Sequence, residues 1–293
     1  MSKPIVVYYH ANCNDGRGAA LTAWFKFGNK ADYRSIGYYD SFPPKHEFEG
    51  KDVFILDFSF ELDDMEKLVE SANSVTLLDH HKTSMNHLEH FDCSESGCKV
   101  VFDMTKSGCV LAYEHFFPGE PIPLMFKYLQ DYDLWEHRYD ESKYVVQALY
   151  SEKFEFRRWK ELCENTHVLE RLIDKGKILY SHELNMAKGF MKKAWKVQVI
   201  DSSPHHNITV VNAPLRLASK LGEVHKNNNE PYPMLVYQEF EKRCGISLRN
   251  GHEKVDVGEI ASTLGKINNC RGGGHPGASG ISPTCHFHEL NWK

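Results

Sequence analysis

The sequence has no long apolar run, and no stretch approaches the roughly 18 to 20 apolar residues that a membrane-spanning helix needs. Its start, Met-Ser-Lys-Pro, leads into a short apolar segment and lacks the apolar core and cleavage site of a signal peptide. Positive charge is not in excess either, because 35 Lys and Arg face 40 Asp and Glu, for a net charge of -5. We therefore expect a cytoplasmic protein without a membrane partner, which would bind a nucleic acid through a local basic patch or a metal.

A disulfide framework is also missing, because the eight cysteines of this 293-residue chain follow no regular spacing. They are Cys13, Cys93, Cys98, Cys109, Cys163, Cys244, Cys270 and Cys285. This usage predicts free thiols in a reducing compartment. His87 and His90 add zinc-type side chains near Cys93, but the spacing matches no common structural zinc site and favours a surface loop.

The first third of the chain alternates between strand-like and helix-like segments. Short apolar runs at 5–9, 53–56, 75–78 and 100–102 indicate buried strands. Apolar residues at three- and four-residue steps indicate a helix over 62–72, and further helices are expected over 19–25, 110–113 and 124–134. A Gly-containing turn is expected at 15–18, and Ser107-Gly108 is expected to cap a helix. This alternation predicts an α/β fold whose parallel sheet is covered on both faces.

The rest of the chain predicts a connector and a second domain. Long helical segments rich in Lys and Glu occupy 154–197, with no strand pattern. Beyond them, strands are expected at 208–211, 233–237 and 244–249, followed by a helix from 257 and a glycine-rich segment at 272–280. We expect a catalytic domain over 1–150, a helical connector over 151–198, and a smaller α/β domain over 199–293.

Side chains that commonly bind metals follow three of the predicted strands. His10 follows the first, Asp57 follows the second, and Asp79-His80-His81 ends the third. Because parallel strands present their carboxyl ends along one edge of a sheet, we expect these side chains to converge. A cluster of His and Asp without paired Cys favours a hydrolytic two-metal site over a structural zinc site.

These residues resemble the DHH phosphoesterase family, and the resemblance covers nearly the whole chain. Its amino-terminal part consists of His10-Ala-Asn-Cys13-Asn-Asp15-Gly16, Asp57, Asp79-His80-His81 and Asp131. Farther along, Ser247-Leu248-Arg249 and Gly272-Gly273-Gly274-His275-Pro276 resemble the DHH-associated domain that usually follows. The family includes manganese-dependent exonucleases of the RecJ type, nano-RNases, cyclic-dinucleotide phosphodiesterases, adenosine-bisphosphate phosphatases and exopolyphosphatases.

The resemblance implies two divalent metal ions, with Mn²⁺ favoured and Mg²⁺, Co²⁺ or Zn²⁺ as alternatives. The implied ligands are His10 and Cys13 for one metal, Asp15, His80 and Asp131 for the other, and Asp57 between the two. Asp133 is an alternative that fits the family position less well than Asp131. Cys13 is a departure, because many members have an aspartate at this position. A thiolate is a softer ligand that tolerates zinc or iron better than magnesium, so the first metal is either bound by Cys13 or held weakly.

The same resemblance implies the chemistry. Two such ions, about 3.5 to 4 Å apart, would lower the pKa of a water molecule and stabilise charge on the transferring group. The implied catalytic residues are Asp57, Asp79 and His81. Asp79 would orient a neighbouring His or bind metal weakly, and His81 would contact the substrate phosphate or protonate the leaving oxygen. In the smaller domain the expected phosphate contacts are Arg249, Gly273, Gly274 and His275.

The expected function is metal-dependent hydrolysis of phosphoester bonds in short oligonucleotides or small nucleotides, with the smaller domain closing over the substrate. One alternative is hydrolysis of a phosphoanhydride, as in an exopolyphosphatase or a pyrophosphatase. Another is a catalytically silent nucleotide-binding protein in which Cys13 has weakened the first metal site. Both a monomer and a homodimer remain open.

Overall fold

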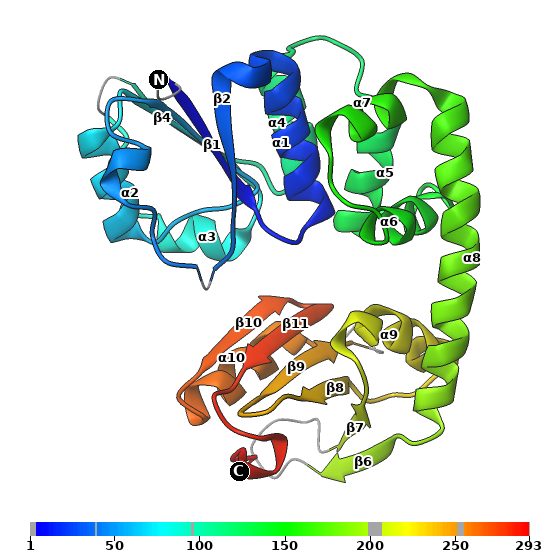
Figure 1. Cartoon of the computed structure of the whole chain (residues 1–293). Helices are drawn as coiled ribbons and strands as arrows, with labels where there is room; N and C mark the ends of the chain where they lie inside the picture. Colours follow the sequence, from blue (N-terminus) through cyan, green and yellow to red (C-terminus); the bar gives the residue numbers. More distant parts are fainter. Residues whose placement is uncertain (1–3, 39, 95–96, 199–206, 251–254, 293) are drawn as a thin grey trace. The chain divides into compact units, whose positions relative to one another are not determined.

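A computed structural model describes residues 4–38, 40–94, 97–198, 207–250 and 255–292. The chain divides into two compact units, Met1–Tyr180 and Ser181–Lys293, and each has its own sheet (Figure 1). Both units combine their sheet with helices, which confirms the predicted α/β class. None of the described helices is long and apolar enough to cross a membrane.

The first unit is built on a five-stranded sheet with strand order β2-β1-β3-β4-β5, in which all neighbours pair in parallel. Its strands are β1 (Ile5–His10), β2 (Ala31–Ile36), β3 (Asp52–Leu56), β4 (Ser74–Asp79) and β5 (Cys98–Phe102). Ile5 pairs with Asp52, which in turn pairs with Ser74, so β1, β3 and β4 end side by side at one edge of the sheet. We predicted four of these strands and missed β2, because this edge strand is largely polar and has two exposed residues.

The first unit has helices on both faces of this sheet and further helices that pack against these (Figure 1). They are α1 (Asn14–Phe27), α2 (Leu62–Ser71), α3 (Lys82–His87), α4 (Gly108–Phe116), α5 (Leu124–Asp133), α6 (Ser142–Tyr150), α7 (Phe156–Glu164) and the first part of α8 (Thr166–Met191), with 3₁₀ turns at Gly28–Lys30 and Lys45–Glu47. Successive strand residues point to opposite faces. Val7 therefore joins a core with Trp159 of α7, whereas Val6 joins another core with Met65 of α2.

The second unit has a six-stranded mixed sheet with strand order β10-β11-β9-β8-β7-β6. Its elements are β6 (Trp195–Gln198), β7 (Asn207–Asn212), α9 (Ala218–Asn227), β8 (Met234–Glu239), β9 (Cys244–Arg249), α10 (Val257–Ile267), β10 (Arg271–His275), β11 (Ala278–Ser282) and 3₁₀ turns at Leu215–Leu217 and Phe287–Glu289. Within this sheet β8 and β9 form an antiparallel pair. Leu235 of β8 packs in one core with Ala261 of α10, and Val236 of β8 packs in the other core with Leu221 of α9.

The segment that we expected to be a connector is shared between the two units. Trp159 and Leu172 are buried in the first unit's core, whereas Ala187 is buried in the second unit's. The division after Tyr180 therefore lies inside α8 and not at the ends of 151–198. The segment also contains β6, a strand that we did not predict, because its four residues include Lys and Gln and show no apolar run.

Two glycine-containing segments are regular structure and not loops. Residues 15–18 belong to the first turns of α1, and a Cβ at Gly16 would lie only 2.5 Å from the carbonyl oxygen of His10. Glycine here lets α1 start against the end of β1. Residues 272–274 lie in β10, where a Cβ at Gly272 would collide with the carbonyl oxygen of Ala261. Gly272 is therefore needed for the packing of α10 on the sheet.

The expectation of free thiols is wrong at two positions. Cys93 and Cys98 form a disulfide between the segment after α3 and the start of β5, with Cα atoms 5.3 Å apart. The other six cysteines are free. Within the described part of the chain, His87 and His90 join no group of metal-ligating side chains.

Candidate metal centre

The buried carboxylate of Asp57 lies at the centre of the site. Asp57 directly follows β3 and has a φ of 57°, a left-handed conformation that aspartate adopts more readily than most residues. Its backbone N–H donates to the carbonyl of Leu78 at 2.9 Å. A Cβ at Gly108 would collide with the Asp57 side chain, so only glycine lets the start of α4 lie against this carboxylate. Asp57 is thus held in place by both the sheet and α4.

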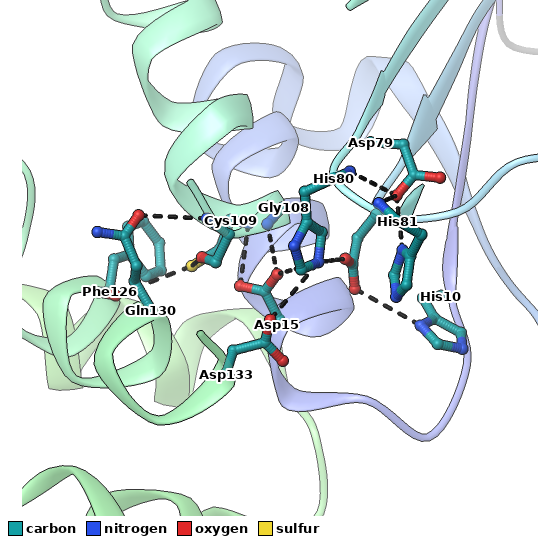
Figure 2. A network of polar contacts seen from close by, with 12 residues as sticks. His10, Asp15, Asp79, His80, His81, Gly108, Cys109, Phe126, Gln130 and Asp133 are labelled. Atoms are coloured by element: carbon teal, nitrogen blue, oxygen red, sulfur yellow. Dashed lines mark hydrogen bonds and ion pairs between the residues drawn. The ribbon is translucent and has the colours of Figure 1, made fainter. Parts of the chain in front are cut away.

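Asp15, in the first turn of α1, is held by the amino terminus of α4. Its carboxylate accepts hydrogen bonds from the backbone N–H groups of Gly108 (2.5 Å) and Cys109 (3.1 Å), as Figure 2 shows. The first N–H groups of a helix have no partner within the helix, and the helix dipole favours negative charge there. Ser107 is the N-cap of α4, as predicted, although its side chain makes no capping hydrogen bond. The two helices therefore fix the Asp15 carboxylate beside Asp57.

His80 lies among three carboxylates. Its Nε2 is 3.0 Å from Oδ1 of Asp57, 3.5 Å from Oδ2 of Asp133 and 3.8 Å from Oδ2 of Asp15. Figure 2 shows the ring of His80 turned toward Asp15 and Asp133. Asp15, His80 and Asp133 each offer a ligand atom, and these atoms lie within 4.8 Å of one another. The structure therefore forms a potential ligand group from these three side chains.

We expected Asp131 in this group, but the structure places its carboxylate elsewhere. Asp131 is buried, but its carboxylate accepts hydrogen bonds from the backbone N–H groups of Arg138 (2.5 Å) and Tyr139 (3.4 Å). It thereby stabilises the segment after α5. Asp133, two residues later near the end of the same helix, reaches His80 instead. Residues two apart on a helix point in different directions, so only one of them can face the site.

His10, Cys13 and Asp57 form a second group of potential ligands, whose ligand atoms also lie within 4.8 Å of one another. Nδ1 of His10 is 3.6 Å from Oδ2 of Asp57. Cys13 is the N-cap of α1, with its backbone extended and no capping hydrogen bond from its side chain. Burial, together with the charges of Asp57 and Asp133, raises the pKa of the Cys13 thiol. A bound cation would instead lower the pKa of this thiol, because it stabilises the thiolate.

Asp79 holds the residues that follow it. Its Oδ1 accepts hydrogen bonds from the backbone N–H of His80 (2.7 Å) and of His81 (3.3 Å), and it lies 2.7 Å from Nδ1 of His81. Its Oδ2 accepts a hydrogen bond from the hydroxyl of Ser59 at 2.6 Å. Asp79 therefore orients His81, as one of the two predicted roles requires.

The charges of the cluster shift the pKa values of its members. Burial and the charge of Asp57 raise the pKa of Asp15, and burial and the charge of Asp15 raise the pKa of Asp133 to about 7. Burial disfavours the charged form of Asp57, but the contacts with His10 and His80 outweigh it and lower the pKa of Asp57. Burial likewise disfavours a charged His80, but the bond with Asp57 raises the pKa of His80 to about 10. The cluster therefore attracts positive charge.

A divalent cation fits this set of side chains. Oδ2 of Asp57 and Nδ1 of His10 are buried, and neither has a hydrogen-bond partner in the described part of the chain. Buried polar atoms rarely remain without a partner, and a cation between these two atoms would bind both. Carboxylate oxygens, imidazole nitrogens and one sulfur suit a first-row transition ion better than Mg²⁺. The residues thus fit a metal centre with Asp57 facing both ligand groups.

The residues that we expected to bind substrate in the second unit lie on two strands of its sheet. Arg249 ends β9, and its guanidinium donates to the hydroxyls of Ser247 (2.7 Å) and Ser219 (3.3 Å) and to the carbonyl of Leu248 (2.8 Å). Gly273 and Gly274 lie in β10, at the edge of the sheet, and a Cβ at Gly273 would meet no atom within 4 Å. The side chain of His275 lies outside the described part of the structure.

Three contributors to the site were not predicted from the sequence. Gly108 was expected as part of a helix cap, but its close approach to Asp57 was not. Ser59 binds Asp79, and the ring of Tyr38 packs edge-on against His10 with centroids 5.3 Å apart. Of these, only the Ser-Gly pair before an apolar run gave a recognisable pattern in the sequence.

Two known proteins resemble this chain over most of its length. No protein-family model matches the chain. An uncharacterized protein of Acanthamoeba polyphaga mimivirus is 26% identical over 94% of this chain and 67% of its own length. Oligoribonuclease NrnB of Bacillus subtilis (strain 168) is 27% identical over 96% of this chain and 74% of its own length.

Among solved structures, RecJ from Thermus thermophilus in complex with Mn²⁺ is similar in fold. It matches 96% of this chain with a TM-score of 0.54 and 14% identity, and the chain spans 50% of the length of that RecJ. The similarity to NrnB covers 96% of this chain, and His and Asp side chains that are far apart in the sequence converge beside Asp57. Together with the fold, these findings support a DHH-family phosphoesterase.

Proposed function

We propose that the protein is a metal-dependent phosphoesterase that hydrolyses short oligonucleotides or small nucleotides. The principal support is the placement of Asp57 between the two groups of potential ligands. Its Oδ1 lies 3.0 Å from Nε2 of His80, in one group, and its Oδ2 lies 3.6 Å from Nδ1 of His10, in the other. One carboxylate that reaches two cations is a recurrent feature of two-metal hydrolytic sites. The similarity to an oligoribonuclease supports short oligonucleotides as the substrate class.

The proposed ligands form two groups around Asp57. They are His10 and Cys13 on one side, and Asp15, His80 and Asp133 on the other. Bound divalent cations, with Mn²⁺ favoured, would lower the pKa of a water molecule and stabilise negative charge on the phosphoryl group. Asp133 takes the place that the family resemblance assigned to Asp131. Cys13 is expected to favour softer ions at its position.

His81 is the proposed residue for direct contact with the reacting group. Asp79 holds its Nδ1, and Ser59 in turn holds Asp79, so the ring has a defined orientation. From this orientation the ring would donate to a phosphate oxygen or give a proton to the leaving oxygen. In the second unit, Arg249, Gly273, Gly274 and His275 remain the proposed contacts for a further phosphate.

A substrate panel tests this function. Purified protein is freed of metal with EDTA and assayed with Mn²⁺ on 5′-phosphorylated di- to tetranucleotides, a cyclic dinucleotide, adenosine bisphosphate and polyphosphate. We expect hydrolysis of the short oligonucleotides that requires added metal and is lost in Asp57→Asn. Turnover of polyphosphate alone would assign a phosphoanhydride hydrolase instead. Binding of nucleotides with no turnover under any metal would identify a silent nucleotide-binding protein.

A further inference from the structure

A cation and an exposed aromatic ring lie on the Cys13 side of the metal centre, and neither takes part in the metal centre itself. Arg17 lies one helical turn after Cys13 on α1, and its backbone N–H donates to the carbonyl of Cys13 at 3.1 Å. Tyr150 is the last residue of α6, and its side chain is 57% exposed. An exposed tyrosine beside a buried polar cluster calls for an explanation.

A buried hydrogen bond places the end of α6 beside the first turn of α1. The side-chain amide of Asn14, which lies between Cys13 and Asp15 in the sequence, donates to the carbonyl of Val146 at 3.3 Å. Val146 precedes Tyr150 by one helical turn. The last turn of α6, which ends at Tyr150, therefore lies next to the first turn of α1.

Arg17 is held in place without being neutralised. Its guanidinium lies over the ring of Phe154, 6.0 Å from the centroid, and its NH1 group donates to Oδ1 of Asn14 at 3.3 Å. Across the described ranges, no carboxylate forms an ion pair with Arg17. A guanidinium has five donors in a planar fork that matches phosphate, and only one of these groups is engaged here. The structure thus presents a charged anion-binding group near an otherwise acidic cluster.

We propose that Arg17 and Tyr150 bind the nucleotide unit next to the scissile phosphate, with the guanidinium on its phosphate and the tyrosine ring stacked on its base. This inference rests on the proposed function and adds a subsite within the first unit. An exposed aromatic ring can stack on any base, and an arginine contact to the phosphate backbone of the nucleotide does not depend on the base sequence. The pair would therefore select for a second nucleotide without selecting for its base.

Two substrates separate this subsite from the metal centre. The first is 5′-phosphorylated diadenylate, which has a second nucleotide, and the other is bis(p-nitrophenyl) phosphate, which has neither a second phosphate nor a base. Arg17→Gln is expected to raise KM for the dinucleotide about tenfold or more, because it removes a charge-assisted hydrogen bond. Tyr150→Ala is expected to raise it about fivefold or more, and Tyr150→Phe is expected to retain the wild-type KM, because the ring alone stacks. None of these variants should change kcat/KM for bis(p-nitrophenyl) phosphate.

Arg157→Gln is the matched control for charge, since Arg157 is an exposed arginine of the same unit on α7. It should behave as wild type on both substrates. The proposal is overturned if Arg17→Gln and Tyr150→Ala leave KM for the dinucleotide unchanged. It is equally overturned if they reduce the rates on both substrates in parallel, because that would indicate damage to the metal centre.

Binding is measured independently of turnover, by fluorescence anisotropy of labelled tetra-adenylate with Ca²⁺ in place of Mn²⁺. If wild type binds the oligonucleotide through Arg17 and Tyr150 but hydrolyses no substrate, the subsite stands and the proposed enzymatic function fails. If wild type hydrolyses the dinucleotide and binding is insensitive to both substitutions, the function stands and the subsite is refuted.

Discussion

Asp57→Asn is the substitution that most directly separates the metal centre from the fold. The change retains the size of the side chain and removes its charge. In the wild type the carboxylate is fully buried and approaches His80 with one oxygen and His10 with the other. Loss of a residue that merely supports a metal ligand costs about 10- to 100-fold in metal affinity. Since Asp57 faces both ligand groups, we expect at least a loss of this size for each metal.

The loss of affinity has a measurable consequence for stability. A metal present at 100 times its Kd stabilises the folded state by about 2.7 kcal/mol if it does not bind the unfolded chain. In a unit of this length, 1 kcal/mol shifts Tm by about 2 to 4 °C, so Mn²⁺ should raise the wild-type Tm by about 5 to 11 °C. A Kd that is 100-fold weaker leaves only about 0.4 kcal/mol, or about 1 °C.

The assay compares Tm with and without Mn²⁺ after EDTA treatment, and circular dichroism verifies that the variant is folded. Asp174→Asn is the control, because it removes the same charge from an exposed site on α8 of the first unit, where Asp174 pairs with Lys177. This control should retain the wild-type increase in Tm. An equal Mn²⁺-dependent increase in wild type and Asp57→Asn would refute the assignment of Asp57 to the metal centre.

Three further predictions concern neighbouring positions. Asp133→Asn should abolish most of the Mn²⁺-dependent activity. Asp131→Ala should retain metal binding, measured by calorimetry. It should lose about 1 to 3 kcal/mol of unfolding free energy, measured in urea, because two backbone N–H groups lose their acceptor. Gly108→Ala should destabilise by about 1 to 3 kcal/mol and inactivate, because its Cβ would collide with Asp57. The matched Gly189→Ala, with open space around its Cβ in α8, should instead stabilise by about 0.5 to 1 kcal/mol; similar results for the two glycines would contradict the packing argument. Cys13→Asp should raise the Mn²⁺- and Mg²⁺-supported rates relative to the Zn²⁺-supported rate, and an unchanged order of metals would remove Cys13 from the ligand set.

The strand ends of the first unit could be predicted from the sequence because buried parallel strands leave a clear pattern. Continuous apolar runs preceded Asp57 and Asp79, and the structure places both residues at the carboxyl edge of adjacent strands. The edge strand β2 is largely polar, and β6 has only four residues, so neither shows this pattern. A continuous apolar run thus indicates a strand that is buried on both faces, and strands at the edges of a sheet lack such a run.

The choice between Asp131 and Asp133 could not be made from the sequence. The two residues stand on the same helix and differ by two positions, so a rotation of α5 by about half a turn would exchange them. The rotation is set by packing, since Met125 and Leu129 are buried in the core of the first unit. The glycines at 272–274 posed a similar problem. Their composition indicates a loop, yet Gly272 is required by the close approach of α10.

Anomalous diffraction at the manganese edge, from crystals of the wild-type protein grown with Mn²⁺, would locate the metal ions directly. We expect two anomalous peaks, one bound by His10 and Cys13 and the other by Asp15, His80 and Asp133, with Asp57 binding both. The weaker peak should lie at Cys13, since sulfur is the poorer ligand for Mn²⁺. Crystals that bind Mn²⁺ elsewhere on the molecule, with Asp57 in contact with no ion, would contradict this expectation.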